Sequence, residues 1–232
     1  MFERDNTFPA PLATATTSFL PKVYGWMTAG LALTALASIL TLSSEAALQL
    51  IFGNRLVFYG LIIGELGLVI AMSAAINRIS AATATLMFLA YSALNGVTFA
   101  SIFLIYTRSS IASTFLVASG TFAAMSLYGY ATKRDLTGWG SFLFMGLIGI
   151  VIASVVNIFL HSEMITWVTT YLGVFIFVGL TAYDTQKIKM IGQGGFADGD
   201  SQRKAAILGA LTLYLDFINL FLMLLRIMGN RR

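Results

Sequence analysis

Two aspartates lie inside long apolar runs near the end of the chain. Asp184 stands in a run that reads Leu180-Thr-Ala-Tyr-Asp-Thr-Gln-Lys187, and Asp216 stands in the next, which reads Leu213-Tyr-Leu-Asp-Phe-Ile-Asn219. An ionisable side chain inside an apolar run of membrane-spanning length is costly and marks a functional site by default. Because the two runs are consecutive, the two carboxyl groups could meet in the folded protein.

A pair of carboxyl groups in a low-dielectric site can carry proton-linked chemistry. Two such groups cannot readily both ionise, so they share one proton. Gain or loss of that proton changes the local charge by one unit, and the pair acts as a pH switch. The same oxygens suit a hard cation such as Ca²⁺, but Ca²⁺ takes roughly six to eight oxygens. Asp184 and Asp216 therefore predict transient binding of Ca²⁺ rather than a tight metal site.

A purely local interpretation of the aspartates is also open. Asp184 could form a salt bridge with Lys187, while Asp216 could bond to Asn219 or to a neighbouring helix. Counted at 1.5 Å per residue from the inner end of its helix, Asp216 lies about 16 Å deep in the membrane. This is roughly 10 Å deeper than Asp184. The two can meet only if the last helix is tilted or begins inside the cytoplasmic aqueous zone.

Three further charged residues complete the candidate site. Glu65 and Arg226 lie in apolar runs, at positions that predict the outer half of the membrane, where they could pair. Arg78 lies at the inner end of its run and is the nearest candidate cation for the aspartates.

Membrane-spanning helices must position these side chains. The 232 residues are 58% hydrophobic and 10% charged, with a mean hydropathy of +0.84, whereas soluble domains carry about 25% charged residues. A span needs about 20 mostly apolar residues, and barrel strands are far shorter. The fold class is therefore an all-α integral membrane protein with seven transmembrane helices, at 23–42, 56–76, 82–106, 111–131, 139–160, 164–186 and 205–228.

The domain organisation follows from the same runs. Residues 1–22, rich in Thr, Ala and Pro, predict a flexible cytoplasmic tail, and residues 23–232 predict a single seven-helix transmembrane domain. The one substantial connection is expected at 187–204, where Asp198 and Asp200 suggest a solvated turn because the EF-hand pattern is absent.

The basic residues predict a cytoplasmic N-terminus, because cytoplasmic loops carry the excess of Lys and Arg. With the N-terminus inside, nine basic residues fall on the inner side: Arg4, Lys22, Arg78, Lys133, Arg134, Lys187, Lys189, Arg203 and Lys204. Five fall on the outer side: Arg55, Arg108, Arg226, Arg231 and Arg232.

Composition also excludes several functions. The basic residues occur singly or in pairs and form no patch for nucleic acid. The chain has no cysteine, which removes disulfide and thiolate chemistry. The only histidine is His161, which removes multi-histidine metal and haem sites. No bound cofactor is expected.

Several ordered motifs carry a family resemblance. Val178-Gly-Leu-Thr followed by Tyr183-Asp-Thr-Gln186, Leu94-Asn-Gly-Val-Thr-Phe99, and Leu213-Tyr-Leu-Asp-Phe-Ile-Asn-Leu-Phe221 resemble the Bax inhibitor-1, or transmembrane Bax inhibitor motif, family. The resemblance covers the chain from Lys22 to Arg232. The segment Ser126-Leu-Tyr-Gly-Tyr-Ala-Thr-Lys-Arg-Asp-Leu136 resembles the bacterial inner-membrane branch.

The resemblance implies a fold in which the last helix, 205–228, is central and surrounded by the other six. It also implies a pH-sensitive calcium leak in the cytoplasmic membrane, gated by protonation of a di-aspartyl site, and no enzymatic activity. By motif, that site falls on Asp184 and Asp216, and an arginine latch falls on Arg78. The expected partners are the lipid bilayer, H⁺ and Ca²⁺, with Ca²⁺ as the transported ion.

Two other functions stay open. The first is a regulatory membrane protein that binds a membrane protease or a stress-response partner without transport. The second is an intramembrane aspartyl protease, for which Tyr183-Asp184 supplies half of the pattern. The other half, Gly-x-Gly-Asp, is missing, because Leu213-Tyr-Leu-Asp216 stands in its place.

Overall fold

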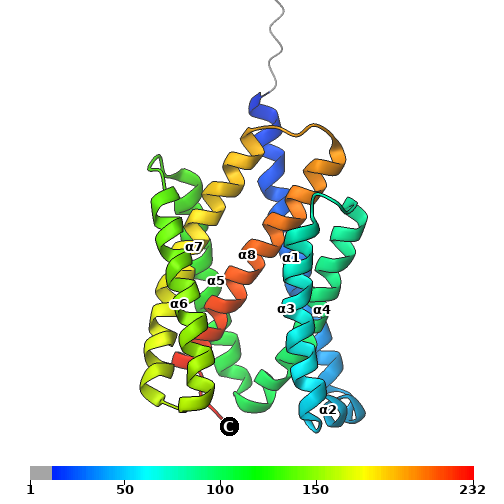
Figure 1. The fold of residues 1–232 in the computed structure, drawn as a ribbon, viewed down its shortest axis with the longest axis vertical. Helices are drawn as coiled ribbons and strands as arrows, with labels where there is room; N and C mark the ends of the chain where they lie inside the picture. Colours follow the sequence, from blue (N-terminus) through cyan, green and yellow to red (C-terminus); the bar gives the residue numbers. More distant parts are fainter. Residues whose placement is uncertain (1–11) are drawn as a thin grey trace, which may run out of the picture.

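A computed structural model describes residues 12–232, with side chains from Phe19 onward, as a bundle of helices (Figure 1). The described residues form α1 (Leu12–Leu42), α2 (Glu45–Phe52), α3 (Arg55–Ala75), α4 (Ala81–Ile105), α5 (Arg108–Ala131), α6 (Thr137–Leu160), α7 (Glu163–Gln193) and α8 (Gly199–Met228). Seven of these, all except α2, are long and apolar enough to cross a membrane. The predicted all-α class with seven spans is confirmed.

Side chains that cap the first turns fix where the helices begin. The first backbone N–H groups of a helix lack partners within it, and Ser, Thr or Asp just before the helix can accept from them. Four long helices start in this way, after Ser80, Thr107, Ser162 and Asp198, and Asn54 caps a fifth, α3, in the same manner.

Three boundaries differ from the sequence-based expectation. Residues 1–11 of the predicted tail lie outside the described residues, and α1 already begins at Leu12, with Pro21 inside it. The expected connection 187–204 is wrong in extent, because α7 continues to Gln193 and α8 begins at Gly199. Residues 188–193 contain no proline, so the helix keeps its backbone hydrogen bonds beyond Lys187.

The short helix α2 was not predicted. It has only eight residues, too few to register as a membrane span, and it connects α1 to α3. Ser44 caps its start by accepting a hydrogen bond from the backbone N–H of Ala47.

The last helix, α8, crosses the bundle diagonally (Figure 1). It packs against α1, α4, α5 and α7, and most of its apolar segment is buried. By contrast, α3 and α6 leave nearly all of their apolar segments uncovered, since α3 packs mainly against α4, and α6 against α7. The arrangement of six helices around a central α8 stays a prediction, but the α7–α8 interface is the one that carries both aspartates.

Candidate functional site

Asp184 on α7 and Asp216 on α8 lie close together at the interface between these helices. Asp184 is 8% exposed and Asp216 is 4% exposed, and the two carboxyl groups are near enough to interact directly. In Figure 1, α8 crosses the bundle diagonally, and it packs against α7, so the depth difference counted from the sequence does not keep the two aspartates apart. The structure therefore brings the two predicted residues together, while their role as ion pathway and pH sensor stays a prediction.

The pair is incompletely satisfied by the protein. Oδ2 of Asp216 is buried and has no hydrogen-bond partner among the described residues. The local alternative is not seen in the described part of the chain: Asp184 forms no ion pair with Lys187, and the Asn219 amide donates to the carbonyl of Leu215 at 2.8 Å. A buried acceptor without a donor is costly. This oxygen is therefore the atom most in need of a proton or a cation.

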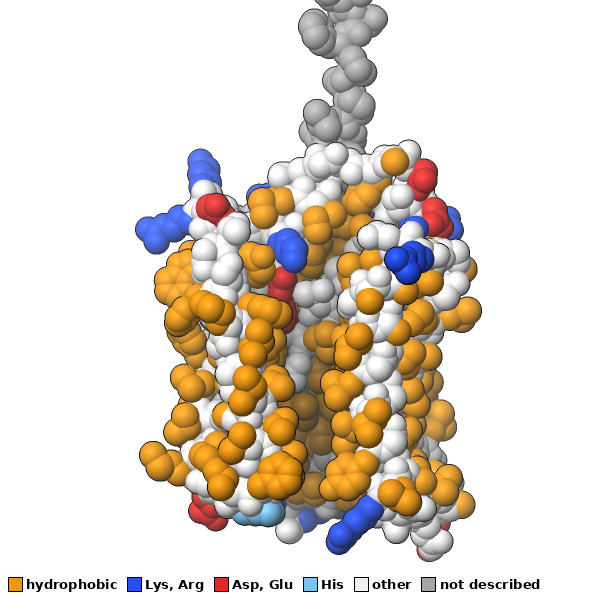
Figure 2. Space-filling view, in the orientation of Figure 1, with side chains coloured by type: hydrophobic (Ala, Val, Ile, Leu, Met, Phe, Trp, Pro, Cys, Tyr) orange, Lys and Arg blue, Asp and Glu red, His pale blue; other side chains and the backbone are white. Residues whose placement is uncertain are grey.

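A groove of about 890 Å³ leads to the pair between α6, α7 and α8. Figure 2 shows this side of the molecule hollowed between two rows of apolar side chains, with acidic and basic side chains toward the upper end. The polar lining residues are concentrated where Lys187 and the two aspartates lie. The remaining walls are mainly apolar and include Phe144, Leu147, Val151, Val155, Ile158 and Phe177.

The four residues from Tyr183 to Gln186 each have a different neighbour, because successive helical residues point about 100° apart. The Tyr183 ring lies against Gly140 of α6, where a Cβ would approach the ring to 2.4 Å. The Thr185 hydroxyl lies 3.4 Å from the Tyr24 hydroxyl and 3.5 Å from that of Ser126. These contacts hold α7 between α1, α5 and α6, so the direction in which Asp184 points is fixed from both sides.

Gln186 ties α7 to the connection between α5 and α6. Its amide oxygen accepts from the backbone N–H of Leu136 at 2.9 Å, and its amide nitrogen donates to the carbonyl of Arg134 at 2.8 Å. From the sequence, Gln186 was recognised only as part of a motif and was assigned no role. Its position two residues after Asp184 was the available signal.

An apolar cluster lies at the interface of α6, α7 and α8, on the side of the pair that faces the opposite end of the bundle. It consists of Leu143, Ile150, Ile176, Phe177, Leu180 and Leu220. Along α7, Ile176 and Phe177 lie between Asp184 and Thr170, and along α8 the fully buried Leu220 lies between Asp216 and Arg226. We call these six residues the apolar plug.

Glu65 and Arg226 do not pair, so this expectation is wrong for the structure. The Glu65 carboxylate accepts a hydrogen bond from the Thr98 hydroxyl of α4, and the Arg226 guanidinium donates to the Thr170 hydroxyl of α7 at 3.2 Å. The reason is the packing, because α3 lies against α4 while the last turn of α8 lies near α7.

Arg78 is exposed in the turn between α3 and α4 and forms no ion pair within residues 12–232. The cation that lines the groove beside the aspartates is Lys187, whose Nζ lies 5.9 Å from the centroid of the Tyr183 ring. The latch role of Arg78 stays a prediction.

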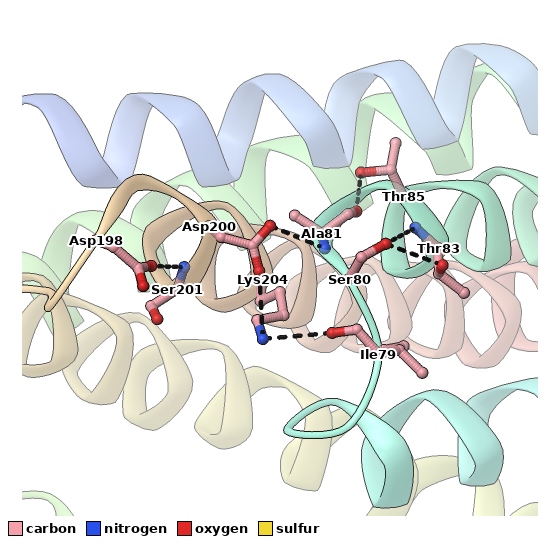
Figure 3. Close-up of polar contacts among 9 residues, drawn as sticks. All are labelled: Ile79, Ser80, Ala81, Thr83, Thr85, Asp198, Asp200, Ser201 and Lys204. Carbon is pink, nitrogen blue, oxygen red and sulfur yellow. Dashed lines mark hydrogen bonds and ion pairs between the residues drawn. The ribbon is translucent and has the colours of Figure 1, made fainter.

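The turn that carries Arg78 is fixed to the start of α8 (Figure 3). The Asp200 carboxylate accepts from the backbone N–H of Ala81 at 3.2 Å and forms an ion pair with Lys204 at 3.4 Å. The Lys204 ammonium also donates to the carbonyl of Ile79 at 3.3 Å. Asp200 is therefore a structural anchor rather than part of a free turn.

Asp198 caps α8 by accepting from the backbone N–H of Ser201 at 2.6 Å (Figure 3). Its hydrogen bonds to Ser201 hold the pKa of the Asp198 carboxyl below its usual value. In the same way, hydrogen bonding to Thr137 lowers the pKa of Asp135 before α6. Both carboxylates therefore accept backbone hydrogen bonds at the start of a helix.

Within the described residues, no three His, Cys, Asp or Glu side chains come together in a way that could hold a metal ion. A cation at Asp184 and Asp216 would therefore meet two carboxylates and would take its other ligands from water. Such a site would hold Ca²⁺ weakly, because high affinity for Ca²⁺ needs more protein oxygens.

Comparison with known proteins extends over nearly the whole chain. A family model described as "Inhibitor of apoptosis-promoting Bax1" matches residues 16–232. The inner membrane protein YbhL of Escherichia coli (strain K12) is 57% identical over 232 residues, which are 100% of this chain and 99% of that protein. An uncharacterized protein of Borreliella burgdorferi is 49% identical over 214 residues, 92% of each chain. The Rickettsia prowazekii protein RP147 is 46% identical over 216 residues, 92% of this chain and 90% of its own.

Proposed function

The chain belongs to the Bax inhibitor-1 family, and on that premise we propose that it is a pH-sensitive cation leak channel of the bacterial inner membrane. The conducted ion is Ca²⁺, and the gate is the pair formed by Asp184 and Asp216. One observation carries the proposal: two carboxyl groups from consecutive membrane-spanning helices meet in a buried place, and one oxygen there lacks a partner.

The gating step follows from the charge of the pair. With one shared proton, the two carboxyl groups attract each other and hold α7 and α8 together. When the proton leaves, the two negative charges repel, and the pair needs a cation. A Ca²⁺ ion that arrives along the groove meets this need and can pass on, because two aspartates hold it weakly.

The apolar plug explains why such a pathway would be a slow leak. Phe177 and Leu220 are buried directly beyond the aspartates, and hydrated ions do not cross a dry apolar layer without rearrangement. Separation of α7 from α8 at the charged pair would loosen the same layer, since both helices contribute to it. Arg78 would act as a latch through its turn, which is bonded to the first turn of α8.

The test is Ca²⁺ flux into proteoliposomes from about pH 6 to about pH 8. Wild-type protein is expected to show a flux that changes with pH, and Asp184→Asn and Asp216→Asn are expected to lose that change. Glu163→Gln, which neutralises an exposed carboxylate at the start of α7, is the matched control and should keep it.

Unchanged pH dependence in both aspartate variants would contradict the gate. If the pure protein shows no flux but co-purifies with a stoichiometric partner, the regulatory function is favoured instead. Cleavage of a single-span substrate that is lost in Asp184→Asn would favour the aspartyl protease. The chain lacks the Gly-x-Gly-Asp part of that pattern, so we expect no cleavage.

A further inference from the structure

The groove beside the aspartate pair has the dimensions and chemistry of a site for an amphiphilic molecule. Its volume of about 890 Å³ lies in the range of small-molecule sites, roughly 300–1,000 Å³. The lining residues of α6 run from Gly140 to Ile158, which corresponds to about 27 Å along the helix axis. The groove is therefore long enough for an extended chain as well as a head group.

The two ends of the groove differ in polarity. Near Gly140, the lining includes Asp184, Asp216 and Lys187, whereas toward Ile158 it consists mostly of aliphatic and aromatic side chains. Many of these apolar side chains are exposed at the surface of the bundle, including Phe144 and Val151. A ligand that matches the groove has one polar end and one apolar chain.

The charge and the hydrogen-bonding capacity of the polar end specify the head group. Among the described residues, Oδ2 of Asp216 has no donor, but it also has almost no accessible surface, so a head group would meet the pair at the other atoms with which the two aspartates line the groove. Lys187 forms no ion pair with either aspartate in the described residues. The two carboxyl groups that line this end outnumber its one cation, Lys187, so a head that carries a positive charge and N–H donors fits it better than a phosphate or carboxylate head.

We propose that the groove binds a single-chain amphiphile with a primary ammonium head, which donates to Asp216 and Asp184 while its chain lies along α6. In a bilayer the chain gains little by moving from lipid into the groove, because lipid tails are as apolar as the groove walls. The ammonium contact therefore decides the affinity. The proposal concerns the carboxyl groups of the proposed function but does not require that ions cross the membrane.

Dodecylamine is the probe, and 1-dodecanol, with the same chain and an uncharged head, is its control. Binding to the full chain in lipid nanodiscs is measured by equilibrium partition, with empty nanodiscs as the reference for uptake by lipid. We expect saturable binding of one dodecylamine per chain and roughly tenfold or more weaker binding of 1-dodecanol, because a hydrogen bond to a charged group is lost.

Two variants locate the site. Asp216→Asn is expected to weaken dodecylamine binding by roughly tenfold or more, and Glu163→Gln should leave it unchanged. Val151→Trp places a large ring in the groove wall at an exposed position, without altering either carboxyl group, and is also expected to weaken binding. It remains informative if Asp216→Asn does not fold.

The proposal is overturned if dodecylamine and 1-dodecanol bind equally, or if Val151→Trp binds dodecylamine like the wild type. The two proposals fail separately. Saturable binding without Ca²⁺ flux would contradict only the leak channel, and pH-dependent flux without saturable binding would contradict only the amphiphile site.

Discussion

At the scale of single residues, Gln186 shows how the structure fixes the direction in which the buried carboxyl group of Asp184 points. Its side-chain amide makes two hydrogen bonds to the backbone of the α5–α6 connection, at Leu136 and Arg134. Gln186→Met keeps the length of the side chain but leaves that backbone donor and acceptor without partners. We expect a loss of about 1–3 kcal/mol in the free energy of unfolding, measured by denaturation of the purified protein in detergent.

Gln193→Met is the matched control for this prediction. Gln193 lies on the same helix but is exposed, and its replacement should change the stability little. Equal stability of the two variants would show that the bonds of Gln186 contribute nothing beyond what water supplies.

Asp198 gives a pH-dependent prediction outside the membrane. Because its pKa is lower in the folded protein, its stabilising effect is fully present above the ordinary value of 3.8 and is lost as the pH falls through the folded pKa. Asp198→Ala should therefore lower the melting temperature by a few degrees at about pH 7. The difference from wild type should shrink as the pH approaches about 3.

Thermal unfolding at both pH values checks this prediction. Asp198→Asn retains an uncharged acceptor for the backbone N–H of Ser201, so it should be the milder substitution at about pH 7. A difference between wild type and Asp198→Ala that is the same at both pH values would rule out a titrating cap.

The aspartates of the candidate site could be selected from the sequence by their residue type. The sequence did not show which charged residues lie next to each other. An aspartate in an apolar run is conspicuous by itself, which is why Asp184 and Asp216 were selected from the sequence. The pairing of Glu65 with Arg226 was wrong, because membrane depth does not determine which helices are neighbours. Each has a hydroxyl partner instead, at Thr98 or Thr170, and no charge pattern indicates such a contact.

At the scale of helices, the apolar plug predicts how the proposed leak would be limited. Phe177 of α7 is buried, whereas Phe175, on the same helix, is 57% exposed. Phe177→Ala would open a space in the apolar plug, which we propose as the barrier between the aspartates and the far end. We expect a Ca²⁺ flux in proteoliposomes several times that of wild type, and no change for Phe175→Ala.

The stability of Phe177→Ala must be followed in the same experiment, because removal of a buried aromatic side chain costs about 3–5 kcal/mol. A raised flux counts only if the melting transition of the variant lies above the assay temperature. An intact Phe177→Ala protein with wild-type flux would place the barrier to ions elsewhere.

The presence of the seven long helices could be predicted from the length and apolarity of the runs in the sequence. The residues at which the helices end could not. All seven spans were predicted because a run of about 20 apolar residues is too long for a barrel strand and too apolar for a loop. The continuation of α7 from Lys187 to Gln193 was missed, because Lys187 and Lys189 interrupt the apolar run, although a charged side chain does not end a helix. The start of α8 at Gly199 was marked by the Asp198 cap, although the sequence there also fits a solvated turn.

At the scale of the whole molecule, the tilt of α8 is what sequence counting could not supply. Residue depth counted along the chain separates Asp184 from Asp216, whereas the two carboxyl groups lie together in the structure, in which α8 crosses the bundle diagonally (Figure 1). Tilt is set by packing against several neighbours at once, here α1, α4, α5 and α7, and it leaves no periodic signal in one helix.

The orientation of the molecule decides which compartment the aspartates face. The end that carries the α7–α8 connection also carries most of the basic residues, which predicts that it is cytoplasmic.

Because the chain has no cysteine, a single introduced cysteine can be labelled without background. With an impermeant maleimide on intact spheroplasts, Ser109→Cys, in the first turn of α5 at the opposite end, should react. Gly194→Cys should react only after permeabilisation, since the groove then opens near the cytoplasmic face. The reverse labelling pattern would place the polar end of the groove, and the proton that the pair exchanges, on the periplasmic side.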